Sequence, residues 1–195
     1  MTIWHIARGA GLSAVVLLTL ATCLGALVSA RLPRRPGTRV VMQYMHRAIA
    51  STALAVLGLH ITMILADSFA HVGVLGALIP FQSRYRGLWV GMGSIAAYVL
   101  LLVAASGFWR SRFTRSARAV RAWRAIHSCS YGAWALAMLH GYFSGSDSAL
   151  SWVRWLYLAC LGAVAASGAV ALIGRRRPAL SPSRTVPARD LAVSR

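Results

Sequence analysis

The sequence contains no lysine and no glutamate, and its only acidic residues are Asp67, Asp147 and Asp190. All 21 basic residues are therefore arginines, and the formal net charge is +18. With no glutamate, and with the three aspartates outside the apolar stretches, the chain lacks the acids that hydrolysis inside a membrane would need. We therefore predict no catalytic acid, base or nucleophile and look to other side chains for function.

Motifs for several common cofactors and partners are missing as well. Cys23, Cys129 and Cys160 form neither a CxxC pair nor the CxxCH sequence that attaches c-type haem, so we interpret them as packing residues. No glycine-rich dinucleotide fingerprint occurs in residues 1–195, so the chain is not expected to oxidise NAD(P)H alone. The arginines lie in blocks beside apolar segments and are not interleaved with aromatics, which argues against a nucleic-acid partner.

Long apolar runs are abundant. Hydrophobic residues make up 58% of the chain, the mean hydropathy is +0.63 and only 12% of residues are charged, which is too apolar for a soluble domain. A bilayer core of about 30 Å needs roughly 20 apolar residues per helix. Five segments qualify: 9–30, 41–66, 87–108, 123–143 and 150–173. We predict an all-α integral membrane helical bundle with about five transmembrane helices over residues 1–174, in contact with a lipid bilayer, and a disordered Arg/Pro-rich tail at 175–195.

The arginine blocks predict the topology. Four arginines lie in 31–39, five in 110–121 and six after 174, whereas 67–86 holds two and 144–149 none. The positive-inside rule then predicts a multi-pass protein of the cell membrane with its N-terminus outside and its C-terminus cytoplasmic. Residues 67–86 are too short and too interrupted by Gly and Pro to span, and we expect them at the outer interface.

The first 30 residues allow a second interpretation. Arg8 precedes an apolar run that ends in VSA, which is typical of a cleaved signal peptide. Translocation of the four arginines that follow would oppose the same charge rule, so we favour a retained helix.

Four histidines lie in two of the predicted helices. His46 and His60, in MHRAIASTALAVLGLH, are 14 positions apart, and His127 and His140, in WRAIHSCSYGAWALAMLHGYF, are 13 apart. At 1.5 Å per residue these spacings are about 21 Å and about 19.5 Å along parallel helices. We therefore expect two pairs at matching depths, His46 with His127 and His60 with His140. Ionisable residues inside membrane helices are costly and are candidates for function.

Two imidazoles from facing helices can hold the iron of a b-type haem, and two such haems would form an electron path across the membrane. All four histidines are thus predicted metal and haem b ligands. The angles raise an objection, because 14 positions return within roughly 40° of the starting face of a helix whereas 13 end about 140° away. The helix with His127 and His140 must therefore twist, bulge or approach its haems from different sides.

Other polar residues near the histidines have two interpretations each. Arginines are candidate partners of haem propionates, namely Arg47, Arg121 and Arg124 at the inner end and Arg84, Arg86 and Arg154 at the outer end. The alternative is that they extend to lipid headgroups. His5 and His71 fall outside the predicted spans and are interpreted as interfacial. Six tryptophans at predicted helix ends are interpreted as interface anchors: Trp4, Trp89, Trp109, Trp123, Trp152 and Trp155.

Three stretches together resemble a known family. HRxxxxxxLxxLxLH at 46–60, IPFQSRYRGLWVGMG and WRAIHSCSYGAWALAMLHGYFSGSD resemble the ferric reductase-like transmembrane domain, which ferric reductases and NADPH oxidases share and which also occurs in stand-alone actinobacterial proteins. The resemblance runs from about Met42 to Ile173. It implies a helical bundle with two b haems held by His46, His60, His127 and His140. In larger relatives these histidines lie on the third and fifth of six helices, whereas here they lie on the second and fourth of five.

The resemblance also implies a function. Electrons would pass from a cytoplasmic or quinone donor through both haems to an extracytoplasmic acceptor. Because a flavin and nicotinamide domain is not seen here, a separate flavoprotein, a ferredoxin-like protein or a quinone is the expected donor. The alternatives are a relative with one haem, or a cofactor-free membrane scaffold or accessory protein whose histidines pack between helices.

Overall fold

The computed structural model describes residues 2–30, 32, 35–67, 72–114 and 116–176. These residues form helices and no strand: α1 (Thr2–Ser29), α2 (Pro36–Ala66), α3 (Gly73–Leu78), α4 (Gly87–Phe108), the 3-10 helix η1 (Arg110–Thr114), α5 (Ala117–Ser144) and α6 (Ser151–Arg176). The predicted all-α fold is therefore confirmed. His71 and residues 177–195 of the predicted tail lie outside the described residues.

Four of these helices are long and apolar enough to cross a membrane: α1 from Ile3, α2, α4, and α6 as far as Gly174. Large apolar side chains such as Leu102, Leu158 and Leu172 are exposed on their surfaces, as expected for contact with lipid. The chain is thus a multi-pass membrane protein. The helix α5 is 28 residues long but less apolar, since it contains three arginines and two histidines, and its crossing stays a prediction.

The helices extend further than the hydropathy indicated. The predicted spans begin at residues 9, 41 and 123, whereas α1, α2 and α5 begin at residues 2, 36 and 117. Local signals explain this: Pro36 occupies the first turn of α2, and the Ser116 side chain accepts a hydrogen bond from the Ala119 N–H at 3.1 Å. Helix ends therefore follow capping and backbone propensity rather than the edge of the apolar run.

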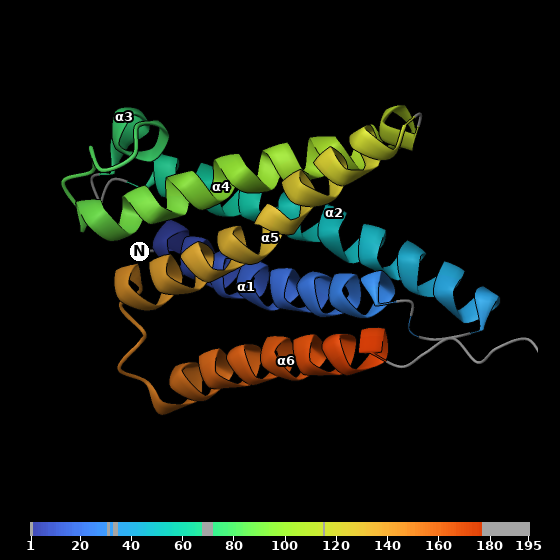
Figure 1. Cartoon of the computed structure of the whole chain (residues 1–195). Helices are drawn as coiled ribbons and strands as arrows, with labels where there is room; N and C mark the ends of the chain where they lie inside the picture. Colours follow the sequence, from blue (N-terminus) through green and yellow to red (C-terminus); the bar gives the residue numbers. More distant parts are fainter. Residues whose placement is uncertain (1, 31, 33–34, 68–71, 115, 177–195) are drawn as a thin grey trace, which may run out of the picture.

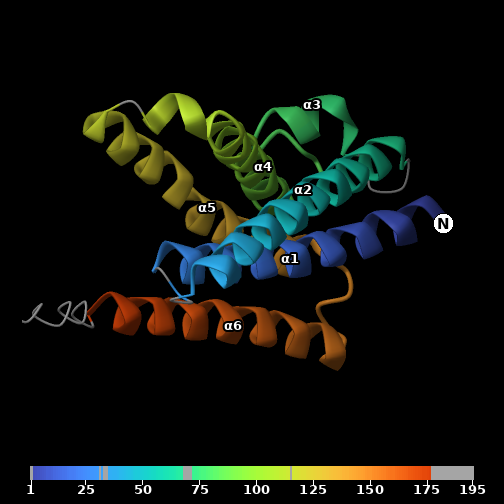
Figure 2. The ribbon, with the colours of Figure 1, turned by 90° about the vertical axis from the view of Figure 1, so that its right-hand side faces the viewer.

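Two helical hairpins form most of the bundle (Figure 1). The helix α1 packs along α2, and α4 packs along α5, and these are the most extensive helix contacts. The helix α6 lies against α1 on the side away from α4, as the turned view also shows (Figure 2). The buried centre draws on α1, α2, α4, α5 and α6: Val15, Leu18, Ala53, Leu100, Ala133, Trp134, Met138, Val153, Tyr157 and Cys160.

The segment between α2 and α4 does not span. Its helix α3 has six residues and exposes Leu75 and Leu78, which suits the membrane interface expected from the sequence. Two hydroxyls fix α3 to α4: Ser94 donates to the Ala77 carbonyl at 2.7 Å, and Tyr98 donates to the Leu78 carbonyl. The connection is therefore held close to one end of α4.

Candidate functional site

The four histidines of α2 and α5 meet in two pairs. The rings of His46 and His127, called the inner pair from the predicted topology, have centroids 6.2 Å apart and planes inclined by 65°. The rings of His60 and His140, the outer pair, have centroids 6.3 Å apart and planes inclined by 73°. The structure thus brings together the residues that were expected to share a depth. His5 belongs to neither pair.

Backbone carbonyls of neighbouring helices orient three of these rings. The Nδ1 atom of His46 lies 2.9 Å from the Ala21 carbonyl oxygen, and that of His60 lies 2.8 Å from the Ala7 oxygen, both on α1. The Nδ1 atom of His140 lies 2.8 Å from the Trp89 oxygen on α4. Because a carbonyl only accepts, Nδ1 carries the proton, and Nε2 keeps its lone pair for another partner. Histidine ligands of metals show this arrangement in general.

Each histidine also faces a glycine of the adjoining helix. A Cβ atom at Gly11 or Gly25 of α1 would lie 3.0 Å or 3.3 Å from the ring of His60 or His46. On α4, a Cβ at Gly93 would lie 2.7 Å from His140, and one at Gly107 would lie 3.6 Å from His127. Glycine therefore lets the imidazoles approach the helix backbone closely.

The carbonyl and the glycine form one repeated unit. The acceptors Ala7, Ala21 and Trp89 each precede the facing glycine by four residues, so the accepting oxygen is also the one that the glycine N–H bonds within the helix. The facing glycines are 14 positions apart on α1 and again on α4, the same spacing as His46 and His60. Two hairpins therefore present matched histidine supports.

His127 departs from this pattern only in part, because the Val103 carbonyl, four residues before Gly107, also interacts with its ring. It lies 13, not 14, positions from His140, and its Nδ1 is 3.5 Å from the Ser106 hydroxyl, beyond the usual range of hydrogen bonds. The Ser106 hydroxyl itself donates to the Val103 carbonyl at 2.7 Å. The helix α5 is α-helical throughout, without a bulge, and its axis curves along its length (Figure 1). Both pairs therefore form without a bulge in α5, and at His127 the Ser106 hydroxyl shares the Val103 carbonyl.

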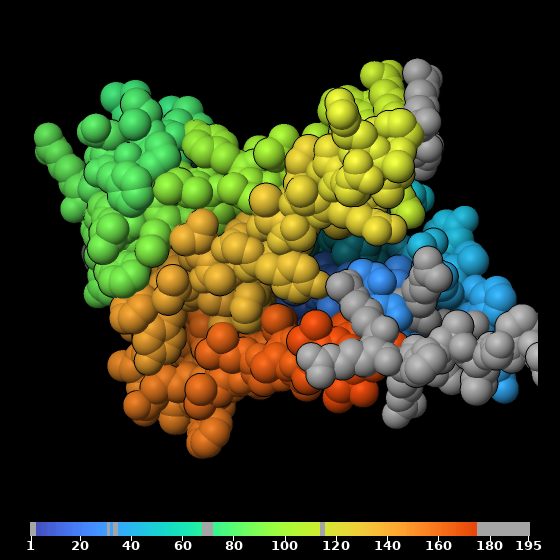
Figure 3. Space-filling view, viewed as in Figure 1, coloured from blue at the N-terminus to red at the C-terminus, as the bar shows by residue number. Residues whose placement is uncertain are grey.

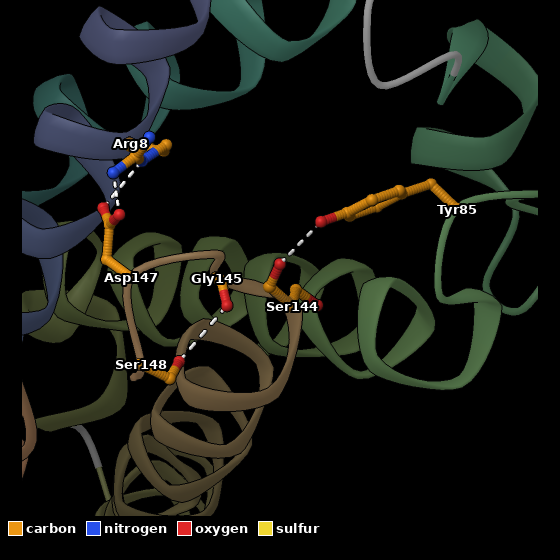
Figure 4. Close-up of polar contacts among 6 residues, drawn as sticks. All are labelled: Arg8, Tyr85, Ser144, Gly145, Asp147 and Ser148. Carbon is orange, nitrogen blue, oxygen red and sulfur yellow. Dashed lines mark hydrogen bonds and ion pairs between the residues drawn. The ribbon is translucent and has the colours of Figure 1, made fainter. Parts of the chain in front are cut away.

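The outer pair lines a cavity of about 290 Å³ with a mainly apolar wall. Its polar groups gather at one end, where Figure 4 shows Arg8 of α1 reaching Asp147 of the α5–α6 loop. The Arg8 Nε donates to Asp147 at 2.7 Å, and the two side chains form an ion pair. The Tyr85 hydroxyl donates to the Ser144 carbonyl at 3.0 Å on the other side. The cavity thus combines two histidines, an apolar wall and a polar rim.

The arginines expected beside the histidines are placed differently. Arg84, Arg86 and Arg154 are exposed, and none of them lines the outer cavity, where Arg8 lies instead. At the inner end Arg47, Arg121 and Arg124 are exposed as well, while Arg110 interacts electrostatically with His127. Neither arginine was expected near the histidines from the sequence. A single arginine within an apolar helix and a single aspartate in the loop after α5 could have indicated the pair of Arg8 with Asp147.

The pairs can hold a metal only with further ligands. Among the described residues no group of three or more His, Cys, Asp or Glu side chains could coordinate an ion. Each pair therefore fits a metal that brings most of its ligands, as haem iron does. A metal held by two imidazole nitrogens at about 2.0 Å each would place the ring centroids about 6 to 6.5 Å apart. Both observed separations lie in this range.

Comparison of the chain with protein-family models, with curated proteins and with solved structures finds no match.

Proposed function

We propose that the chain transfers electrons across a membrane through two b-type haems, held by His46 with His127 and by His60 with His140. The observation that carries this proposal is that both pairs have nearly the same ring separation, 6.2 Å and 6.3 Å, in a helical membrane protein. Chance packing of four separate histidines would not be expected to give two such pairs. The resemblance to ferric reductase-like membrane domains points in the same direction.

The residues of the chain have defined roles in this proposal. Ala7, Ala21 and Trp89 hold the protons of three histidines on Nδ1, which directs Nε2 to the metal. The glycines let the rings approach, and the apolar cavity wall excludes water from the outer pair. When bound, haem supplies one-electron chemistry of iron. The inner and outer pairs are about 21 Å apart along α2, which is most of a bilayer core.

The direction of transfer follows from the predicted topology. The inner pair lies toward the arginine-rich end of the bundle, so a cytoplasmic flavoprotein, a ferredoxin-like protein or a quinone is the proposed donor. The acceptor is proposed on the opposite, extracytoplasmic side. The chain would serve as an electron-transfer subunit, an oxidoreductase component that depends on a separate donor.

The test is a pyridine haemochrome assay on detergent-purified protein, together with a spectrum of dithionite-reduced minus oxidised protein. We expect about two b haems per chain. Ala at His46 or His127 should remove the inner haem, and Ala at His60 or His140 should remove the outer one. Gln at His5, which lies on α1 outside both pairs, serves as the matched control and should retain both haems.

The alternative outcomes have clear meanings. Protein that binds no haem after expression with haem supplied would favour a cofactor-free scaffold. One haem that only the inner or only the outer variants remove would favour a single-haem relative. Two haems in all four single variants, with unchanged spectra, would show that these histidines are not the ligands.

A further inference from the structure

The inner pair carries an aromatic support that the outer pair lacks. The indole of Trp123 stacks on the ring of His127, with centroids 5.1 Å apart and planes inclined by 21°. The Arg110 guanidinium covers the Trp123 ring at 4.8 Å from its centroid. The Trp123 Nε1 donates to the Ser106 carbonyl at 3.1 Å, which fixes the indole to α4. The three side chains form a continuous column, Arg110–Trp123–His127.

The column stands where the regular support of the histidines is weakest. The other three rings hydrogen bond to carbonyls at 2.8 or 2.9 Å, whereas the carbonyl that faces His127, that of Val103, also accepts from the Ser106 hydroxyl at 2.7 Å. Within the described part of the chain, no tryptophan, tyrosine or phenylalanine stacks on those other rings. The stack therefore adds to the orientation that a shared carbonyl gives the His127 ring.

We infer that the Arg110–Trp123–His127 column positions the His127 ring and raises the reduction potential of the inner centre. This inference rests on the proposed function, because it concerns the metal held by the inner pair. Trp123 restrains the rotation of the imidazole, and Arg110 places a positive charge along the stack, about 10 Å or less from the ring. A nearby cation favours the reduced form of the centre, which carries less positive charge.

A second physical effect acts in the same direction. A strong hydrogen bond from Nδ1 makes an imidazole a more basic ligand, which favours the oxidised metal. At His127 the Val103 carbonyl also accepts from the Ser106 hydroxyl, so we expect the hydrogen bond from the ring to be weaker than those of the other three histidines and its donation to the metal to be reduced. Charge and hydrogen bonding thus both predict that the inner centre is easier to reduce than the outer one.

The location of the column makes it accessible to substitution. The segment formed by η1 and the start of α5 projects at one end of the molecule (Figure 3). Arg110 is exposed there and Trp123 is half-buried, so replacement of Arg110 removes a charge without opening the helix core. Arg112 lies on the same η1, is also exposed, and is the matched control.

The experiment uses the His140→Ala protein, in which only the inner centre is expected to bind haem. Potentiometric titration would compare Arg110→Gln with Arg112→Gln in nanodiscs of stated lipid composition. For Arg110→Gln we expect about a fivefold smaller ratio of reduced to oxidised centre at a fixed potential, a midpoint lower by about 40 mV at 59 mV per tenfold change. For Arg112→Gln we expect less than half of that shift.

Two aromatic variants test positioning separately. Low-temperature EPR of the oxidised protein reports how the axial imidazoles are oriented. Trp123→Phe keeps a ring over His127 and should give one low-spin signal, whereas Trp123→Leu removes the stack and should broaden or split it. Haem content measured on the same samples shows whether each variant is loaded.

The results separate the two proposals. If the His140→Ala protein binds no haem at all, the proposed inner site fails, and this inference fails with it. If the protein binds haem but Arg110→Gln and Arg112→Gln shift the midpoint equally, or Trp123→Leu leaves the EPR signal unchanged, the inference alone is overturned. Trp123 would then be an interface anchor and Arg110 a lipid-facing cation.

Discussion

Replacement of Gly93 by alanine tests how closely the histidines must approach the neighbouring backbone. The new Cβ would lie 2.7 Å from the His140 Nδ1 and 2.8 Å from its Cγ and Cε1, whereas ordinary contact begins at 3.4 Å. The ring must therefore retreat by about 0.7 Å, which would stretch the 2.8 Å hydrogen bond to the Trp89 carbonyl close to its limit. The same movement would change the 6.3 Å separation of the His140 and His60 rings.

The expected cost follows from these distances. Loss of the hydrogen bond costs about 0.5–1.5 kcal/mol, and overpacking adds about 1–3 kcal/mol. The greater helix propensity of alanine offsets about 1 kcal/mol. We expect a net loss of about 0.5–3.5 kcal/mol in the free energy of unfolding, measured by thermal unfolding in detergent, and loss of the outer haem in the haemochrome assay.

Gly107→Ala is the matched control on the same helix. Its Cβ would lie 3.6 Å from the His127 Cε1, an ordinary contact, so this variant should keep both haems and its stability. Gly11→Ala and Gly25→Ala, with approaches of 3.0 Å and 3.3 Å, should fall between the two. The reasoning is refuted if Gly93→Ala matches Gly107→Ala in both stability and haem content.

Three further outcomes are expected. Trp134→Phe should lower the free energy of unfolding by about 1–2 kcal/mol, because the buried Nε1 donates to the Thr19 hydroxyl at 2.9 Å; a double-mutant cycle with Thr19→Val that shows strict additivity would contradict this. Asp147→Asn should lower it by about 1 kcal/mol through loss of the half-buried ion pair with Arg8, and the difference should shrink at high salt; a salt-independent difference would argue against a charge effect. Intact-mass measurement of purified protein should find residues 1–30 retained, since α1 supplies the acceptors Ala7 and Ala21; a chain that begins after Ala30 would show that this helix is a cleaved signal.

Much of the fold could be predicted because membrane helices have a strong hydropathic pattern. The apolar runs located all five long helices, and α4 was predicted with its observed bounds. The predicted starts of α1, α2 and α5 were wrong by five to seven residues, because polar first turns stay helical outside the apolar run, whereas their C-terminal ends were predicted to within one residue. The lower hydropathy of α5 reflects the histidines and arginines that make it the most informative helix for function.

The candidate site could be predicted only in part. The pairing of His46 with His127 and of His60 with His140 was predicted from their matching positions along the helices. These positions do not show which atoms orient each ring. The carbonyl acceptors were not predicted, because every residue has a backbone carbonyl and the residue type does not show which one accepts a hydrogen bond. The facing glycines do show a pattern in the sequence, because Gly11 with Gly25 and Gly93 with Gly107 repeat the 14-residue spacing of His46 with His60.

From the 13-residue spacing, His127 and His140 were expected about 140° apart around their helix, yet both pairs form. Both histidines of α5 reach their partners on α2 although the helix is continuous and contains no bulge. At His127 the supporting Val103 carbonyl also accepts a hydrogen bond from the Ser106 hydroxyl. Trp123, interpreted from the sequence as an interface anchor, lies one turn earlier on the same helix and stacks on that ring.

The division of the supports between two hairpins bears on how the protein is made. The helix α1 orients both histidines of α2, so the first hairpin has its imidazoles fixed before α4 is synthesised. The second hairpin depends likewise on α4 for His140. Each half can therefore enter the bilayer with its imidazoles already oriented, so that the two histidine pairs form when the halves meet.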